Sequence, residues 1–361
     1  MTISAPSSPT TPTSPGARVL APPLRVAVVG LGERGLAHAG VLATLPRATL
    51  VGFVDSSGAA RKNALGAGFA APSFGKLDRL LAKQQPDAVF VCAPLISRPI
   101  LARRAIAAGC AVFIERPIAL AYGESARVVD EARKAGTPLL SSHALAHQPV
   151  FTRAAETVRG GLIGKVHEVR ASVYVSRVFN AQAADRLIGL LGGGMLAYAA
   201  FDLFSYLVSL FGLPTEASAQ ANRLYGSRED EYHAKLTLPG GGTIGIDCSW
   251  SVPGYPRPAT VIEMQGDRGH LLVSDDALEL DDTAGNHQRW SDADLPQPAR
   301  FDLDGEPRWI EDSAFVDWAL GGPTPTGANL DALRPHALMH AIEASAREGG
   351  KTVPMPDGLA A

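Results

Sequence analysis

The sequence predicts two successive α/β domains. The first is a doubly wound parallel sheet of the Rossmann type, and the second contains an open, mostly antiparallel sheet. Three observations predict this. The 361-residue chain is too long for one ordinary core. Apolar strand patterns alternate with helical patterns over residues 24–143, as in a parallel sheet with helices on both faces. Over residues 144–361 runs of strands replace this alternation, which is typical of an antiparallel sheet covered on one face.

The first 23 residues differ in composition from the rest. They are rich in Ser, Thr and Pro and nearly uncharged, and they lack the basic and then apolar order of a secretion signal. Residues 1–23 are therefore predicted to form a disordered arm, with an arm lying across a partner subunit as the alternative. No stretch has 18 uninterrupted apolar residues, so no membrane association is expected.

The elements of the first domain follow from short apolar runs that end at glycine or a polar residue. LRVAVVG (24–30) is a continuous, largely β-branched run that ends in glycine, which indicates a strand buried on both faces. The remaining strands are expected at 49–55, 87–93, 111–115 and 138–142. Helices are expected up to residue 45 and at 59–66, 76–84, 98–109 and 122–135.

The second domain begins with a predicted helix at 149–160. GKVHEVRASVYVS (164–176) alternates like a long antiparallel strand, and a glycine-flanked helix is expected at 194–211. Turns such as PGGG and GDRG separate the later strands. Those strands are expected at 215–225, 231–238, 243–250, 259–266 and 269–274, with helices at 310–320 and 329–348.

The motif G-x-G-x-x-G at residues 30–35 closes the first strand and opens a helix, and Asp55 ends the second strand. In this context the motif predicts a dinucleotide site. Gly30 permits the turn, Gly32 admits the pyrophosphate, and Gly35 allows close packing of helix and strand. Asp55 would accept hydrogen bonds from the ribose hydroxyls and repel a 2′-phosphate. NAD is therefore expected, with NADP less favoured.

Composition argues against several other classes of protein. The chain has 33 Lys and Arg against 36 Asp and Glu, a net charge of −3, so no nucleic-acid partner is expected. Three widely separated cysteines suit a reducing, cytoplasmic compartment. No metal site is expected, because only the weak pair His143 and His147 has ligand-like spacing.

Further motifs resemble, over nearly the whole chain from residue 24, the glucose–fructose oxidoreductase / inositol dehydrogenase / MocA (Gfo/Idh/MocA) family. They are VVGLGERG (28–35) with His38 after it, DAVFVCAP (87–94), AAGCAVFIERPIAL (107–120), GLIGKVHEVRA (161–171) and LLGGGMLAYAAFDLFSYL (190–207).

The resemblance implies an active site between the domains and hydride transfer to or from a sugar, polyol or related small molecule. It also implies homodimers or homotetramers formed sheet to sheet, and a cis Arg116–Pro117 bond. An exposed apolar sheet face would give the same expectation of assembly. The resemblance further implies a set of residues that contact the cofactor: Gly30, Gly32, Glu33, Arg34, Gly35, Asp55, Ala93, Pro94, Glu115 and Arg116.

The chain departs from the family at its catalytic positions. The family's Glu-Lys-Pro is Glu115-Arg116-Pro117 here, and its helical Asp and His are Tyr198 and Asp202. The i, i+4 spacing places Tyr198 and Asp202 on one helix face. We interpret Tyr198 as the residue that gives a proton to, or takes one from, the reacting substrate oxygen, and Arg116 as the cation that favours the Tyr198 phenolate. Asp202 is interpreted as a base or as a residue that binds a substrate hydroxyl.

His143 and His147, near the domain junction, are candidate substrate-binding residues. For Tyr198, Asp202, His143 and His147 the alternative is an ordinary structural or surface residue, and for Arg116 it is a plain contact with a phosphate or carboxylate. Three functions stay open on the sequence. The first is an NAD(P)-dependent oxidoreductase with atypical catalytic residues. The second is a non-catalytic, regulatory cofactor binder, and the third is an NAD-assisted lyase or glycosidase.

Overall fold

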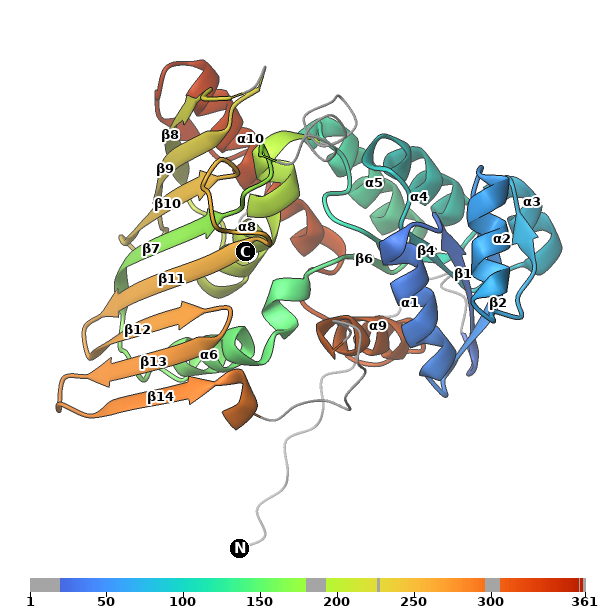
Figure 1. Cartoon of the computed structure of the whole chain (residues 1–361), viewed down its shortest axis with the longest axis horizontal. Helices are drawn as coiled ribbons and strands as arrows, with labels where there is room; N and C mark the ends of the chain where they lie inside the picture. Colours follow the sequence, from blue (N-terminus) through green and yellow to red (C-terminus); the bar gives the residue numbers. More distant parts are fainter. Residues whose placement is uncertain (1–19, 180–192, 226–227, 296–305, 357, 360–361) are drawn as a thin grey trace, which may run out of the picture.

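Two sheets of different construction make up the chain (Figure 1). The computed structural model describes residues 20–179, 193–225, 228–295, 306–356 and 358–359. The predicted disordered arm, residues 1–23, lies outside the described residues except for its last four. Helices α6, α8 and α10 lie between the larger sheet and the N-terminal domain (Figure 1). Among the described residues, no helix is long and apolar enough to cross a membrane.

The first sheet has six parallel strands in the order β3-β2-β1-β4-β5-β6, as predicted for a Rossmann domain. Its central strands are buried on both faces, which explains their continuous apolar runs. The two-residue strand β3 was not predicted, because it is too short to show a pattern. The strands are β1 (Leu24–Val29), β2 (Ala48–Val54), β3 (Ser73–Phe74), β4 (Ala88–Val91), β5 (Ala111–Ile114) and β6 (Leu139–Ser141).

Helices cover both faces of this sheet and form two apolar layers. One layer contains α1 and the C-terminal helix α9, whose Phe315 packs edge-on against Phe90 and Phe113. The other contains α3, α4, α5 and the turn η5. The bounds are α1 (Glu33–Thr44), α2 (Gly58–Gly66), α3 (Leu77–Gln84), η1 (Leu95–Ser97), α4 (Arg98–Ala107), α5 (Tyr122–Ala135), α9 (Glu306–Ala319) and η5 (Asn329–Leu333).

The second sheet has the strand order β14-β13-β12-β11-β7-β10-β9-β8-β15. It is mostly antiparallel, as predicted, but β7 runs parallel to β10 and antiparallel to β11. Strands β13, β14 and β15 were not predicted, because their sequences are polar or very short. The strands are β7 (Val166–Tyr174), β8 (Glu216–Asn222), β9 (Glu231–Thr237), β10 (Thr243–Ser249), β11 (Ala259–Gly266), β12 (Gly269–Ser274), β13 (Ala277–Asp282), β14 (His287–Ser291) and β15 (Val353–Pro354).

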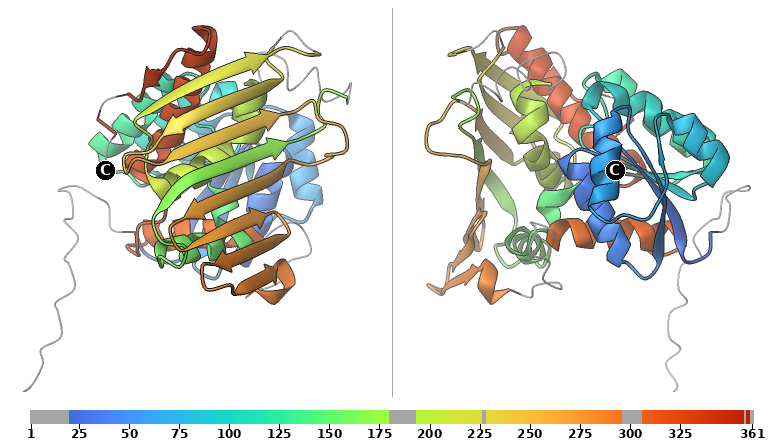
Figure 2. Two further views of the ribbon diagram at one scale, coloured as in Figure 1. Left: turned by 90° about the vertical axis from the view of Figure 1, so that its left-hand side faces the viewer. Right: turned by 45° about the vertical axis from the view of Figure 1, so that its right-hand side comes forward.

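One face of this sheet is covered by helices, and Figure 2 shows the other face open. We expected the open face to be apolar, and this expectation was wrong. It carries charged side chains such as Arg170, Lys235, Asp247 and Glu263, because polar residues alternate with core residues along each strand. Any assembly through this face would therefore use polar contacts.

The helices of the second domain connect it to the first. In α10, Ala337 belongs to the core of the first sheet, whereas Leu338 and Ile342 belong to the core of the second. With α9 also on the first sheet, the C-terminal residues return to the N-terminal domain. The boundaries 24–143 and 144–361 stay predictions. The bounds are η2 (Ala144–His147), α6 (Pro149–Arg159), the π-helical segment η3 (Leu196–Ala200), α8 (Phe201–Phe211), η4 (Asp292–Asp294) and α10 (Arg334–Arg347).

Candidate active site

The glycine motif forms a tight junction between β1 and α1. Gly30 has a positive φ of 92°, and a Cβ there would stand 2.7 Å from the Ala93 backbone. A Cβ on Gly35 would stand 1.8 Å from the Gly30 carbonyl oxygen, so helix and strand are packed as closely as predicted. Gly32 has no atom within 4 Å of its Cβ position, and no side chain caps α1. The helix N-terminus is thus open to an anion, which is the fit that a pyrophosphate requires.

Asp55 follows β2 and is held beside this motif. Its Oδ2 accepts a hydrogen bond from the Leu31 backbone N–H, and its Oδ1 accepts one from the Ser57 N–H, each at 2.8 Å. Both oxygens keep a second lone pair for ribose hydroxyls. The Arg61 guanidinium donates to the Asp55 and Ser56 carbonyls, so it is turned to the backbone.

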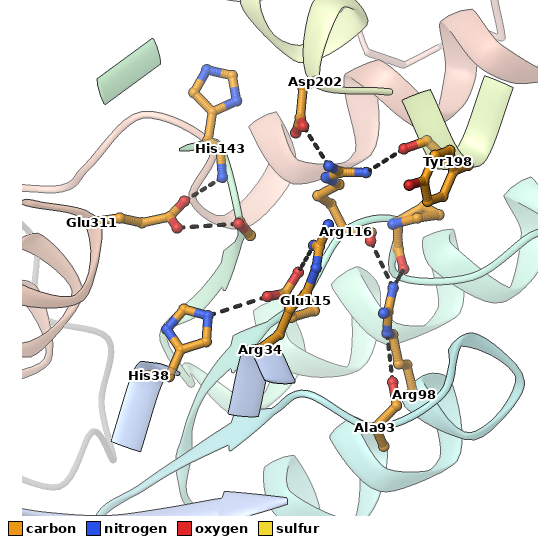
Figure 3. A network of polar contacts seen from close by, with 12 residues as sticks. Arg34, His38, Ala93, Arg98, Glu115, Arg116, His143, Tyr198, Asp202 and Glu311 are labelled. Carbon is orange, nitrogen blue, oxygen red and sulfur yellow. Dashed lines mark hydrogen bonds and ion pairs between the residues drawn. The ribbon is translucent and has the colours of Figure 1, made fainter. Parts of the chain in front are cut away.

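Glu115, at the end of β5, is buried and paired twice. Its carboxylate accepts from Arg34 at 2.5 Å and lies 3.2 Å from His38 Nε2. Burial opposes its charge, but Arg34 and His38 outweigh this and hold the pKa of Glu115 well below its usual value. Burial also lowers the pKa of His38, yet Asp312 and Glu115 raise it to about 9. His38 Nδ1 also lies 2.8 Å from Asp312 Oδ1, so this cluster ties α1, β5 and α9 together and gives Glu115 and Arg34 a structural function. Figure 3 shows the Arg34, His38 and Glu115 side chains.

Arg98 is a site residue that the sequence analysis missed. Its guanidinium donates to the Ala93 carbonyl at 2.9 Å and to the carbonyls of Arg116 and Pro117 at 2.6 and 3.0 Å. It therefore joins the ends of β4 and β5, where the predicted cofactor contacts Ala93, Pro94 and Arg116 lie (Figure 3). An arginine at the start of a helix after a strand carries no signal of this role.

Arg116 brings the two predicted catalytic positions of the second domain to the first domain. Its guanidinium forms an ion pair with Asp202 and donates to the Tyr198 backbone carbonyl at 3.0 Å (Figure 3). The Arg116–Pro117 bond is cis, as the family resemblance predicted. Asp202 Oδ1 is buried and has no hydrogen-bond partner within the described parts of the chain.

The surroundings of Tyr198 differ from the expectation. Its hydroxyl accepts a hydrogen bond from Arg177 Nε at 2.7 Å, and the Arg177 guanidinium lies 5.2 Å from the ring centroid. The cation that contacts the Tyr198 hydroxyl is therefore Arg177, which follows β7. The expectation that Arg116 would lie beside this hydroxyl was wrong, because Arg116 contacts the Tyr198 backbone carbonyl instead. Tyr198 also lies in a π-helical segment, residues 196–200, whereas we expected a continuous α-helix. The sequence shows no signal for either feature.

The two predicted substrate histidines do not join this group. The His143 backbone N–H donates to Glu311, and its ring points away from that carboxylate (Figure 3). Burial, together with His147 and Arg159, lowers the pKa of His143 to about 3, and burial lowers that of His147 to about 4. Both rings are neutral at pH 7. Glu33, at the start of α1, is exposed. No group of metal-ligating side chains occurs within the described ranges.

Comparison with known proteins identifies both halves of the chain. Residues 24–143 match the model of the GFO_IDH_MocA oxidoreductase family with an NAD-binding Rossmann fold. Residues 151–272 match the GFO/IDH/MocA C-terminal domain. The chain is 27% identical over 287 residues to a D-apiose dehydrogenase of Paraburkholderia graminis. The aligned region covers 75% of this chain and 73% of that protein.

Two further proteins are similar. A dTDP-3,4-didehydro-2,6-dideoxy-alpha-D-glucose 3-reductase of Streptomyces violaceoruber is 28% identical over 274 residues, covering 66% of this chain and 78% of the reductase. The structure of a levoglucosan dehydrogenase in complex with NADH and levoglucosan matches the fold with a TM-score of 0.82 and 18% identity. That match covers 92% of this chain and all of the dehydrogenase.

Proposed function

Because the chain belongs to the GFO/IDH/MocA family of NAD-binding oxidoreductases, we propose that it transfers a hydride between NAD and a carbon of a sugar-like alcohol or carbonyl compound. The observation that carries the proposal is the junction of Arg116 with Tyr198 and Asp202. It brings polar groups of the second domain to the end of β5 in the NAD-binding domain. The names of the similar dehydrogenase and reductase support a sugar-like substrate.

NAD would supply the hydride acceptor or donor, and the chain's own residues would bind it and handle the proton. Gly30, Gly32 and Gly35 would hold the pyrophosphate at the start of α1, and Asp55 would bind the ribose. Asp55 also favours NAD over NADP, because its charge would repel a 2′-phosphate. Asp55→Ala is expected to narrow the difference in affinity between NADH and NADPH in fluorescence titrations.

The proton would be exchanged at the Tyr198 hydroxyl. Arg177, which donates to that oxygen, is a positioning residue that also stabilises developing negative charge. Asp202, whose side chain is 23% exposed, would accept a hydrogen bond from a substrate hydroxyl, or a proton during alcohol oxidation. The ion pair with Arg116 keeps this carboxylate in place.

A panel of pentoses, hexoses, polyols and nucleotide sugars tests the proposal, with NADH absorbance at 340 nm as the signal. We expect turnover with at least one sugar-like compound. Binding of NADH without turnover of any compound would favour a non-catalytic binder instead. A product formed with tightly bound NAD and no net change in absorbance would favour the lyase or glycosidase alternative.

We also propose that the chain works in the cytoplasm as a homodimer or homotetramer formed through the open sheet face. Three free cysteines support a reducing compartment. The open face carries charged side chains such as Arg170, Lys235 and Glu263, which could form polar contacts between copies. Light scattering at micromolar concentration tests the assembly, and a monomer in that measurement would contradict it.

A further inference from the structure

A short stretch of backbone after β5 carries Arg116 into the junction between the domains. It includes the cis bond between Arg116 and Pro117, and the Arg98 guanidinium binds the carbonyls of both residues. Proline has no N–H, so the next backbone donor of this stretch is the Ile118 N–H. The way in which that donor is held therefore affects where the Arg116 side chain lies.

The Ile118 N–H is held by a side chain of the second domain, His336 in α10. It donates to His336 Nε2 at 2.9 Å, and His336 Nδ1 lies 2.9 Å from the Ala332 carbonyl oxygen. A carbonyl can only accept, so Nδ1 carries the ring hydrogen and Nε2 is an acceptor. His336 is 0% exposed, and burial lowers its pKa to about 3, although the bond with Ala332 opposes this. The ring is therefore neutral at pH 7, as both contacts require.

The same ring also contacts the helix that carries Asp202. His336 lies edge-on to Phe201 at the start of α8, with 4.6 Å between the ring centroids. Arg116 and Asp202 form the ion pair that joins the domains. His336 thus contacts a close neighbour of each member of this pair, Ile118 two residues after Arg116 and Phe201 one residue before Asp202.

We propose that His336 is a positioning residue. By accepting from the Ile118 N–H it fixes the backbone that carries Arg116, and so it keeps the Arg116 guanidinium in contact with Asp202. Because His336 is fully buried, it acts on the reaction through Arg116 and does not reach the substrate. Its effect on turnover rests on the proposed hydride transfer, whereas its effect on the place of Arg116 does not.

Two variants separate loss of the hydrogen bond from loss of the ring. His336→Phe keeps an aromatic ring beside Phe201 but cannot accept from Ile118. In His336→Gln an amide oxygen can take the place of Nε2 and accept that hydrogen bond. Ile342→Ala, in the same helix but in the core of the second sheet, is the control for destabilisation. All variants are compared at a temperature at which thermal unfolding shows each of them to be folded.

The first measurement needs no substrate. In crystal structures, Arg116 should contact Asp202 in wild type and His336→Gln but not in His336→Phe. Hydrogen exchange over residues 116–120, followed by mass spectrometry, should be faster in His336→Phe than in wild type and Ile342→Ala. An unmoved Arg116 or unchanged exchange in His336→Phe would overturn the proposal. This result stands even if no compound is turned over, which would contradict the proposed function alone.

The second measurement is a double-mutant cycle on kcat, with a substrate from the panel. His336→Phe should lower kcat about ten- to a hundredfold, because a small displacement of a site residue is costly, and His336→Gln should recover most of it. In the Arg116→Gln background His336→Phe should cause no further loss, because residues that act through one another are not additive. The affinity for NADH should stay unchanged. Equal losses in both backgrounds, or a loss in Ile342→Ala as large as in His336→Phe, would reduce His336 to a structural residue and overturn the proposal.

Discussion

Tyr198 and Asp202 are one helical turn apart, yet they have different partners. Arg177 holds the Tyr198 hydroxyl, and Arg116 holds the Asp202 carboxylate. Mutation can therefore alter the proposed proton exchange at Tyr198 and the proposed substrate binding at Asp202 independently.

Tyr198→Phe removes the hydroxyl and leaves the ring in place. Loss of a general acid typically costs a factor of about 10² to 10⁴ in rate, so kcat is expected to fall by that order. The affinity for NADH, measured by fluorescence, should stay unchanged. Tyr174→Phe, on the open sheet face, is the matched control. Turnover of Tyr198→Phe within a factor of two of wild type would exclude Tyr198 as the proton donor.

Arg116→Lys restores the residue that the family carries at this position. Lysine keeps the charge beside Asp202 but cannot make both contacts of the planar guanidinium. If the site catalyses hydride transfer as the family does with lysine at this position, Arg116→Lys should retain or gain kcat/KM. Arg116→Gln should lose most of its kcat/KM. An equal loss of kcat/KM in both variants would mean that the bidentate hydrogen bonding of the arginine guanidinium is required, as it is for binding a substrate carboxylate.

At the scale of the elements, local patterns predicted most of the fold. The G-x-G-x-x-G motif and Asp55 are separated by one helix and one strand, so their spacing alone indicates the contact that Leu31 makes with Asp55. The contact of Arg177 with Tyr198 could not be predicted in this way. It joins the end of β7 to a π-helical segment, and a π-helical turn differs from an α-helical one by a single hydrogen-bond register.

The glycines of the motif give a prediction that separates folding from binding. Gly35→Ala should lower the Tm, because its Cβ would overlap the Gly30 carbonyl. Gly32→Ala should leave the Tm unchanged, because its Cβ position is open, but should weaken NADH binding about tenfold or more by occupying the space of the pyrophosphate. Thermal unfolding and NADH titration of both variants check this. Wild-type NADH affinity in Gly32→Ala would place the cofactor elsewhere.

For the whole molecule, buried ionisable groups determine how stability depends on pH. Burial raises the pKa of Glu311 to about 8, although the His143 N–H opposes this. In the unfolded chain its pKa is near 4.5, so between these values the folded state keeps a proton that the unfolded state releases. The stabilisation is complete below pH 4.5 and is lost as the pH rises through 8.

Glu311→Gln cannot ionise and keeps an oxygen that accepts from the His143 N–H. We expect the Tm of wild type to fall between pH 5.5 and 8.5 more steeply, on the order of several degrees, than that of the variant. Thermal unfolding across this range measures it. Glu33→Gln, at an exposed carboxyl, should behave as wild type. Parallel curves for wild type and Glu311→Gln would show that Glu311 is ionised in the folded protein.

The position of helix α9 on the first sheet affects how the chain can fold during its synthesis. As the protein leaves the ribosome, the strands of the first sheet emerge early. His38 of α1 can then pack against Phe90 and Phe113, but the contact of these two rings with Phe315 forms only when α9 follows. The N-terminal domain thus completes its core only when most of the chain has been synthesised. A fragment cut after residue 143 would lack Phe315 and is expected to expose apolar surface that favours aggregation.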